Sequence, residues 1–165
     1  KIQLYMKNGG LIVFDTRDQS PNNIITKKVS QEQIYLKEIL KSLDLPALIE
    51  VPDNHVLRRS FYLLNELPGR YTGGSVWVEA TARNSKDGVS SIIIGGNNWA
   101  AAWAKDSSNK PIYTVIPGGE KQREFSYRFG INLVMYSMTG NYKADQVHIK
   151  SILKRLNNNS QENSE

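Results

Sequence analysis

The chain alternates short apolar runs with segments in which apolar residues recur at helical spacing. The apolar runs predict β-strands, because they are short, rich in Ile, Val and Leu, and bounded by turn residues. They cover residues 11–14, 48–51, 76–80, 90–94 and 112–116. The runs at 11–14 and 90–94 show no polar alternation, which is typical of strands buried on both faces of a parallel sheet. We therefore expect both in the interior of one mainly parallel sheet.

Helices are predicted between these runs. The clearest starts at Ser30, which forms a capping box with Gln33, and keeps a helical rhythm until Asp44. Further helices are expected at residues 2–6, 99–104, 117–139 and 147–156. Loops are expected at residues 15–28 and 67–74, and residues 56–64 are compatible with either helical or extended structure.

Short strands alternating with helices predict an α/β fold with a doubly wound sheet and right-handed crossovers. The 165 residues suffice for one domain, expected at residues 1–156, and residues 157–165 form a polar tail that we expect to be disordered. Such a fold normally has a strand before its first helix, so we expect the chain to lack its first strand. The unpaired edge would favour self-association, which makes a homo-oligomer an expected assembly.

Composition excludes several kinds of site. The chain has no Cys, and therefore no disulfide, thiolate metal site or cysteine nucleophile. Its two His residues lie far apart in the sequence, so we expect no metal and no cofactor. The net charge is +5, but the basic residues are scattered among 16 acidic ones, and nucleic acid is not an expected partner. No apolar run approaches the roughly 20 residues that span a bilayer.

Polar residues after the first predicted strand form the first candidate site. Asp15, Thr16, Arg17 and Asp18 follow the run at 11–14 directly. Open α/β sheets bind ligands at the carboxyl ends of their strands, which is where these side chains would lie. The alternative is a solvated loop in which Arg17 pairs with a neighbouring carboxylate.

The turn after the fourth predicted strand is the second candidate. Gly95, Gly96, Asn97 and Asn98 precede a short helix, so backbone N–H groups and the positive helix end are available to an anion, with Trp99 beside them. A turn with two glycines is less specific than a full phosphate-binding motif. Packing against the sheet is the alternative explanation for Trp99.

His55 is the third candidate, in a turn with the sequence PDNH at residues 52–55. A His with an upstream Asp can act as a general base. The alternative is a hydrogen-bonded turn residue, because no nucleophile in the sequence pairs with it. A catalytic role would require His55 to share one cleft with Asp15 and Asp18.

Seven segments of the chain together resemble one protein family. Two of them are IGGNNWAAAW at residues 94–103 and TGNYKADQVH at residues 139–148. The others lie at residues 5–18, 53–57, 60–64, 68–71 and 130–136. They resemble the uncharacterised C-terminal domain of large bacterial membrane-anchored proteins that begin with a BatA-like double-transmembrane segment. The likeness covers nearly the whole chain up to Leu156.

That family is in turn similar to the class I glutamine amidotransferase-like fold, which is flavodoxin-like. Amidotransferases present a nucleophilic Cys on a sharp elbow after a strand. The resemblance places this elbow where residues 9–14 lead into Asp15 and Thr16. Since the Cys is missing, the resemblance implies the fold without the glutamine reaction.

Two functions follow as hypotheses. The first is a non-enzymatic ligand-binding or protein-interaction domain, a soluble part of a bacterial protein anchored in the inner membrane, with a small ligand or an envelope protein as its partner. The parent protein alone would link it to the membrane, and either side of the membrane is compatible with the sequence. The alternative is a hydrolase-type enzyme that uses Asp15, Asp18 and His55 on a small or sugar-like substrate. The missing Cys favours the first hypothesis.

Overall fold

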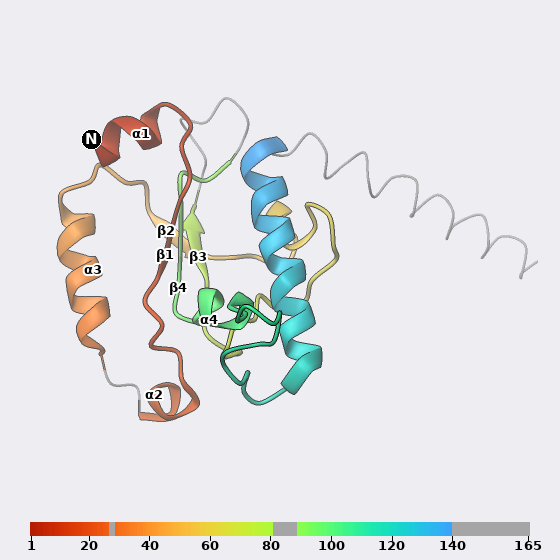
Figure 1. Cartoon of the computed structure of the whole chain (residues 1–165). Coiled ribbons are helices and arrows are strands. Elements are labelled where there is room, and N and C mark those ends of the chain that lie inside the picture. The colour runs from red at the N-terminus through yellow and green to blue at the C-terminus, as the bar shows by residue number, and fades with distance from the viewer. Residues whose placement is uncertain (27–28, 81–88, 140–165) are drawn as a thin grey trace, which may run out of the picture.

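A β-sheet lies between two layers of helices in the computed structural model, which describes residues 1–26, 29–80 and 89–139 (Figure 1). Helices α1 and α3 lie on one side of the sheet, and a long helix at residues 119–139 lies on the other. The remaining elements are listed in chain order: α1 (Ile2–Lys7), β1 (Ile12–Asp15), α2 (Pro21–Thr26), α3 (Gln31–Lys41), β2 (Leu48–Glu50), the 3-10 turn η1 (Val56–Arg58), β3 (Trp77–Glu79), β4 (Ile92–Gly95) and α4 (Trp99–Trp103). The predicted α/β class is confirmed.

The four strands form a mixed sheet in the order β1-β4-β3-β2. β1 and β4 are parallel, with Asp15 beside Gly95, whereas β3 is antiparallel to both β4 and β2. The expectation of a mainly parallel sheet is therefore not confirmed. A parallel neighbour requires a long crossover, usually through a helix. Residues 51–76, which connect β2 to β3, contain η1 as their one helical turn.

Four of the five predicted strands are present as β1 to β4, but the strand predicted at residues 112–116 is wrong. This segment is irregular, and two of its residues, Ile112 and Tyr113, are 55% and 44% exposed. Val115 is buried, at 3% exposure. The apolar run thus reflects one anchoring side chain in a loop rather than a strand.

The predicted helices match α1, α3, α4 and the helix at residues 119–139. The capping box is present in part, because the Ser30 hydroxyl accepts the Gln33 N–H at 3.1 Å. The helix predicted at residues 147–156 and the tail at 157–165 lie outside the described residues.

Helix α2 lies within residues 15–28, where a loop was predicted. Pro21 occupies its first position, where the missing N–H costs nothing because that group has no partner inside a helix. The Ser20 carbonyl accepts the Ile24 N–H at 3.0 Å. Ser20 followed by Pro21 was therefore a helix-start signal hidden among polar residues.

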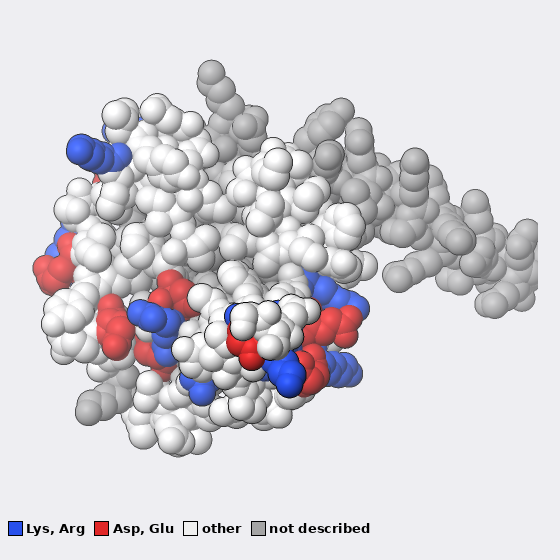
Figure 2. Space-filling model, in the orientation of Figure 1, with Lys and Arg blue, Asp and Glu red and all other residues white. Residues whose placement is uncertain are grey.

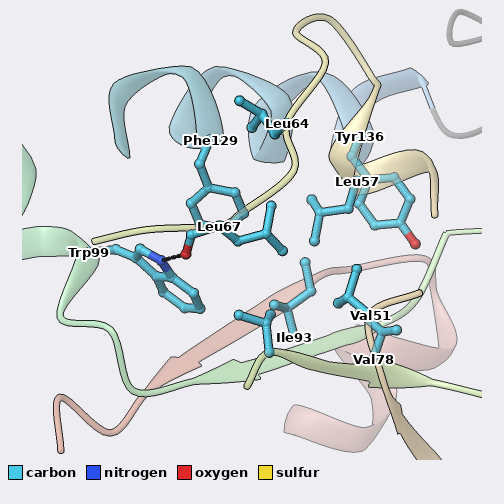
Figure 3. Close-up of a cluster of buried hydrophobic side chains, with 10 residues drawn as sticks. Val51, Leu57, Leu64, Leu67, Val78, Ile93, Trp99, Phe129 and Tyr136 are labelled. Atoms are coloured by element: carbon cyan, nitrogen blue, oxygen red, sulfur yellow. Dashed lines mark hydrogen bonds between the residues drawn. The ribbon is translucent and has the colours of Figure 1, made fainter. Parts of the chain in front are cut away.

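The main hydrophobic core lies between the sheet and the long helix (Figure 3). Phe129 and Tyr136 of that helix pack towards Val78 and Ile93 of the sheet, and all four are at most 1% exposed. Residues 51–76 add further buried side chains: Val51, Leu57, Leu64, Leu67 and Val76. One face of the sheet is thus covered by a helix together with irregular chain.

A buried side-chain amide forms hydrogen bonds with the backbone of the irregular segment at residues 51–76. The Asn132 side chain, fully buried in the long helix, accepts the N–H groups of Phe61 and Tyr62 at 3.1 and 2.7 Å. Its amide nitrogen donates to the carbonyls of Leu57 and Tyr62 at 3.0 and 2.9 Å. All four hydrogen-bonding positions of the Asn132 amide are therefore occupied.

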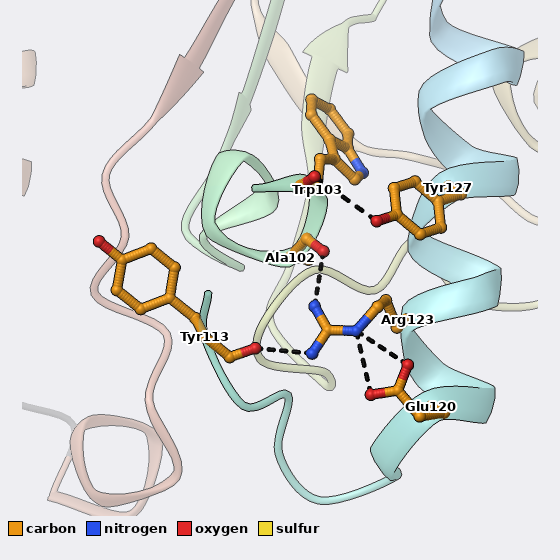
Figure 4. Close-up of polar contacts among 6 residues, drawn as sticks. All are labelled: Ala102, Trp103, Tyr113, Glu120, Arg123 and Tyr127. Carbon is orange, nitrogen blue, oxygen red and sulfur yellow. Dashed lines mark hydrogen bonds and ion pairs between the residues drawn. The ribbon is translucent and has the colours of Figure 1, made fainter. Parts of the chain in front are cut away.

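Arg123 fastens the loop at residues 112–116 to the long helix (Figure 4). Its guanidinium donates to the carbonyls of Ala102 and Tyr113 at 2.8 and 2.6 Å and to the carboxylate of Glu120 at 3.1 Å. The residue is 4% exposed, so its charge is buried, and each of its three side-chain nitrogens donates a hydrogen bond. This explains how an irregular segment keeps a fixed position.

Strand β1 lies at the edge of the sheet, not in its interior as predicted, because its strand neighbour in the described structure is β4 alone. The N–H groups of Ile12 and Thr16 donate inward to the carbonyls of Ser91 and Gly95 at 2.9 and 2.8 Å. Parallel pairing uses alternate residues, so Val13 and Asp15 direct their N–H groups to the open edge. β4 has a paired strand on each side, as predicted.

Replacing Asn132 by Leu is expected to lower the free energy of unfolding by at least about 2 kcal/mol, since four buried backbone groups lose their partner. Urea unfolding followed by Trp fluorescence measures this loss. The matched control is Ser137→Ala on an exposed position of the same helix, expected to stay within about 0.5 kcal/mol. Equal stability of the two variants would refute the role assigned to Asn132.

Amide hydrogen exchange tests the open edge of β1. At low protein concentration the amides of Ile12 and Thr16 should exchange slowly and those of Val13 and Asp15 fast. If copies of the chain pair through this edge, Val13 and Asp15 gain protection as the concentration rises. Slow exchange of Val13 and Asp15 at every concentration would mean that the edge is already covered.

Candidate functional site

The first two candidate sites meet in the structure and bind each other. The Asp15 carboxylate, at the end of β1, accepts the backbone N–H groups of Asn98 and Trp99 at 3.1 and 2.7 Å. It also accepts the Arg17 N–H at 3.2 Å. The anion at the start of α4 is therefore a side chain of the protein itself. Burial raises the pKa of Asp15 above its usual value, and the three N–H donors oppose that shift.

A strand, a sharp turn and a helix occur in succession at β4 and α4, with Asn98 in the left-handed conformation at φ 56°. The elbow was expected at Asp15 and Thr16, but there β1 leads into an irregular loop, in which Arg17 has φ 59°, and not directly into a helix. The residue at the sharp turn is thus an amide without nucleophilic character. Trp99 is 1% exposed and packs against Phe129, which agrees with the packing alternative.

Asp18 lies in a separate network and is 8% exposed. Its carboxylate accepts the Thr16 hydroxyl at 2.5 Å and the Gln33 amide at 2.6 Å, and its backbone carbonyl accepts the Asn23 amide at 2.8 Å. These contacts join the loop after β1 to α2 and α3. Arg17 is exposed beside Asp15, with φ 59°.

His55 is held by contacts near the opposite end of β4. Its Nδ1 accepts the Leu57 N–H at 3.1 Å, and its ring packs edge-on against Tyr136 at 5.6 Å between centroids. The Tyr136 hydroxyl accepts the N–H of Ser90, just before β4 begins. Burial lowers the pKa of His55, and Arg58 and Arg59 lower it further, which favours the neutral ring. In the described structure no hydrogen bond or ion pair joins His55 to Asp15 or Asp18.

One edge of the sheet gathers the carboxyl ends of three strands. β3 is antiparallel to both of its neighbours, so β2 and β4 run in the same direction, which is also that of β1. Asp15, Glu50 and Gly95 therefore end their strands at the same edge, the usual place for a ligand in an open α/β sheet.

Two polar pockets adjoin at this edge. The first, here called the Asp18 pocket, measures about 260 Å³ and is lined by Asp18, Gln19, Asn23, Ile24, Val29, Gln33, Gly73 and Ser75. The second, the Asn97 pocket, measures about 180 Å³ and is lined by Glu50, Arg58, Asn65, Glu66, Leu67, Thr72, Gly73, Gly74, Val76 and Asn97. Gly73 lines both pockets, so the two are neighbours, and together they are here called the polar groove.

Asn97, one of the residues that line the polar groove, has an unsatisfied acceptor. Its side-chain nitrogen donates to the Leu67 carbonyl at 3.0 Å, and the residue is 2% exposed. Its Oδ1 atom is buried and has no hydrogen-bond partner in the described part of the chain. A Cβ on Gly74 would lie 2.5 Å from Oδ1, so glycine at this position lets the backbone approach the amide. Buried acceptors without a donor are rare in native proteins.

Sequence reasoning selected Asp18 and Asn97 but missed most of the groove. Gln33 was assigned to a helix cap, and Glu50 and Arg58 carried no motif. One usable signal was the pair Gly73 and Gly74 in a predicted loop, where Gly73 takes φ 81°. Gly95 and Gly96 serve packing, since a Cβ on either would strike Trp99 or the side chains of residues 16–19.

Charges of both signs occur on the surface of the described residues (Figure 2). Figure 2 shows basic and acidic side chains interspersed on the visible face, separated by uncharged areas. Among the described residues, no group of three or more His, Cys, Asp or Glu side chains is placed to hold a metal ion. None of the described helices combines the length and apolar character needed to cross a membrane.

Comparison with known proteins gives a family match. A family model described as "Domain of unknown function (DUF4159)" matches residues 1–138, which include all the site residues discussed above. No curated protein matches the sequence. The prediction of an uncharacterised domain is consistent with this match, whereas the BatA-like parent and the amidotransferase relationship stay predictions.

Removing the Asp15 carboxylate is expected to destabilise the turn before α4. Asp15→Ala should lower the free energy of unfolding by about 1–2 kcal/mol, the usual effect of losing a helix-capping acceptor. Asp15→Asn should lose less, because its amide oxygen still accepts an N–H. Urea unfolding compares both with Asp53→Ala, which removes a fully exposed carboxylate. A stability of Asp15→Ala equal to that control would show that the contact contributes nothing.

Proposed function

This chain belongs to the DUF4159 family of domains of unknown function, and we propose that it is a non-enzymatic domain that binds a small, uncharged, sugar-like ligand. The observation that carries the proposal is the buried, unsatisfied Oδ1 of Asn97, a residue that lines the polar groove. An unpaired buried acceptor costs about 1–3 kcal/mol. A ligand hydroxyl that reaches Oδ1 would recover part of that cost and thereby gain affinity.

The chemistry of the groove favours a hydroxylated ligand over an anionic one. The amides of Gln19, Asn23 and Gln33 offer both donors and acceptors, and hydroxyl groups of a sugar can satisfy both kinds. Three carboxylates line the two pockets, from Asp18, Glu50 and Glu66, against the single cation of Arg58. This balance of charge opposes a phosphate or a carboxylate ligand.

The arrangement of the acidic residues supports binding rather than catalysis. The Asp15 carboxylate is engaged by three backbone N–H groups, and Asp18 by Thr16 and Gln33. His55 is engaged elsewhere, with Leu57. A general base must reach its proton donor in the same site, and these contacts separate the three groups that the hydrolase hypothesis requires.

We further infer a relationship to the class I glutamine amidotransferase-like fold and a membrane-anchored bacterial parent. The turn from β4 to α4 supports the first, because a residue of positive φ at the start of a helix after a strand is the geometry on which such enzymes present a nucleophile. Here that residue is Asn98. The motifs at residues 5–18 and 94–103 support the second through the family they resemble.

Titration with methyl glucoside, methyl galactoside and N-acetylglucosamine tests the proposal, with glucose 6-phosphate as the anionic comparison. We expect at least one uncharged sugar to bind and to shift the NMR signals of Gly73, Ser75 and Asn97. Ser75→Ala should weaken binding about three- to ten-fold, because it removes one hydrogen-bonding group from the wall. Ser137→Ala, far along the long helix, should leave it unchanged.

Two results would contradict the proposal. One is the absence of binding by all three sugars at millimolar concentration. The other is turnover, such as hydrolysis of nitrophenyl glycosides or release of ammonia from glutamine above a heat-treated control. Turnover abolished by Asp18→Asn or His55→Gln would support the hydrolase hypothesis instead.

A further inference from the structure

A third pocket adjoins the polar groove and differs from it in chemistry. It measures about 400 Å³, more than either the Asp18 pocket or the Asn97 pocket, and lies between residues 63–72 and the start of the long helix. Its apolar lining comes from Leu63, Pro68, Pro117 and Phe125. It is here called the Phe125 pocket.

The Phe125 pocket and the Asn97 pocket share a wall. Asn65, Glu66 and Thr72 line both of them. The Thr72 hydroxyl donates to the Glu66 carboxylate at 2.8 Å. This hydrogen bond joins two parts of the loop that lines both pockets. A ligand long enough to pass this contact would touch a polar groove at one end and an apolar pocket at the other.

Hydrogen bonds of Gln122, which lines the Phe125 pocket, hold the wall of that pocket in place. The Gln122 amide nitrogen donates to the carbonyls of Gly69 and Arg70 at 2.9 and 3.1 Å, and its oxygen accepts the Gly118 N–H at 2.9 Å. The guanidinium of Arg128 lies 5.1 Å from the Phe125 ring centroid and supports that ring. These contacts fix the loop on the helix, so the pocket is preformed, as small-molecule sites usually are.

We propose that the ligand carries an aliphatic chain beside its sugar-like part, and that this chain occupies the Phe125 pocket. This inference rests on the proposed function, because the polar groove supplies the site for the head of the same molecule. Leu63 is 58% exposed although it lines the pocket, so apolar surface remains there for a ligand to bury. The domain would then recognise an alkyl or acyl glycoside rather than a free sugar.

Calorimetric titration with methyl, butyl and hexyl β-glucoside, each below its micelle concentration, tests the inference. We expect affinity to rise about two- to four-fold per methylene, because each methylene leaves water for an apolar wall. Leu63→Ser should flatten this dependence, because the apolar side chain that the alkyl chain would bury is removed. The matched control is Leu4→Ser in α1, where the side chain is 64% exposed and lines none of these pockets.

The outcomes separate this inference from the proposed function. An affinity that does not change with chain length, while methyl glucoside still binds and responds to Ser75→Ala, would overturn the aliphatic chain and keep the sugar site. A chain-length dependence that ignores Ser75→Ala would keep the apolar pocket and contradict the sugar site. The absence of binding by all three glucosides would overturn the inference, and it would also overturn the sugar site if methyl galactoside and N-acetylglucosamine fail to bind as well.

Discussion

Three buried side-chain amides form hydrogen bonds with backbone groups of a long segment that has almost no secondary structure of its own. Residues 51–76 cover one face of the sheet, and buried backbone without hydrogen bonds would be costly. Asn132 bonds Leu57, Phe61 and Tyr62, Gln122 bonds Gly69 and Arg70, and Asn97 bonds Leu67. The core depends on this arrangement, because Leu57, Leu64 and Leu67 reach the interior from that segment.

The same constraint creates the candidate site. The segment returns to the sheet at the edge where β1, β2 and β4 end, so its glycines lie against Asn97 and the loop after β1. Asn97 uses its amide nitrogen for the segment and leaves its oxygen unpaired. One side chain thus carries both a structural hydrogen bond and a buried acceptor without a partner. Pockets on both sides of the loop follow from its position between the sheet and the long helix.

At the start of α4, a side chain of the protein takes the position where a bound anion could lie. Backbone N–H groups at a helix start attract an anion. Here Asp15 fills that role, which ties the end of β1 to the turn after β4 in addition to their parallel pairing. The N–H groups at the start of α4 therefore have a structural role, because they connect β1 with the turn after β4. The groove beside it is lined by amides and hydroxyls together with the carboxylates of Asp18, Glu50 and Glu66 and the guanidinium of Arg58.

The sequence by itself determined the local elements. Apolar runs and capping residues located β1 to β4, α3 and the long helix. The spacing of apolar residues and the presence of a capping residue both depend only on residues that are close in the sequence. Asp15, Asp18, Asn97 and Asn98 were also found, since position after a strand is visible in sequence. Tertiary structure alone decided that β3 is antiparallel, that β1 is an edge, that residues 112–116 form a loop held by Arg123, and that Asp15 binds the turn it was expected to accompany. Those outcomes depend on contacts between residues far apart in the chain, and a hydrophobic pattern does not specify which distant partner satisfies a given backbone group.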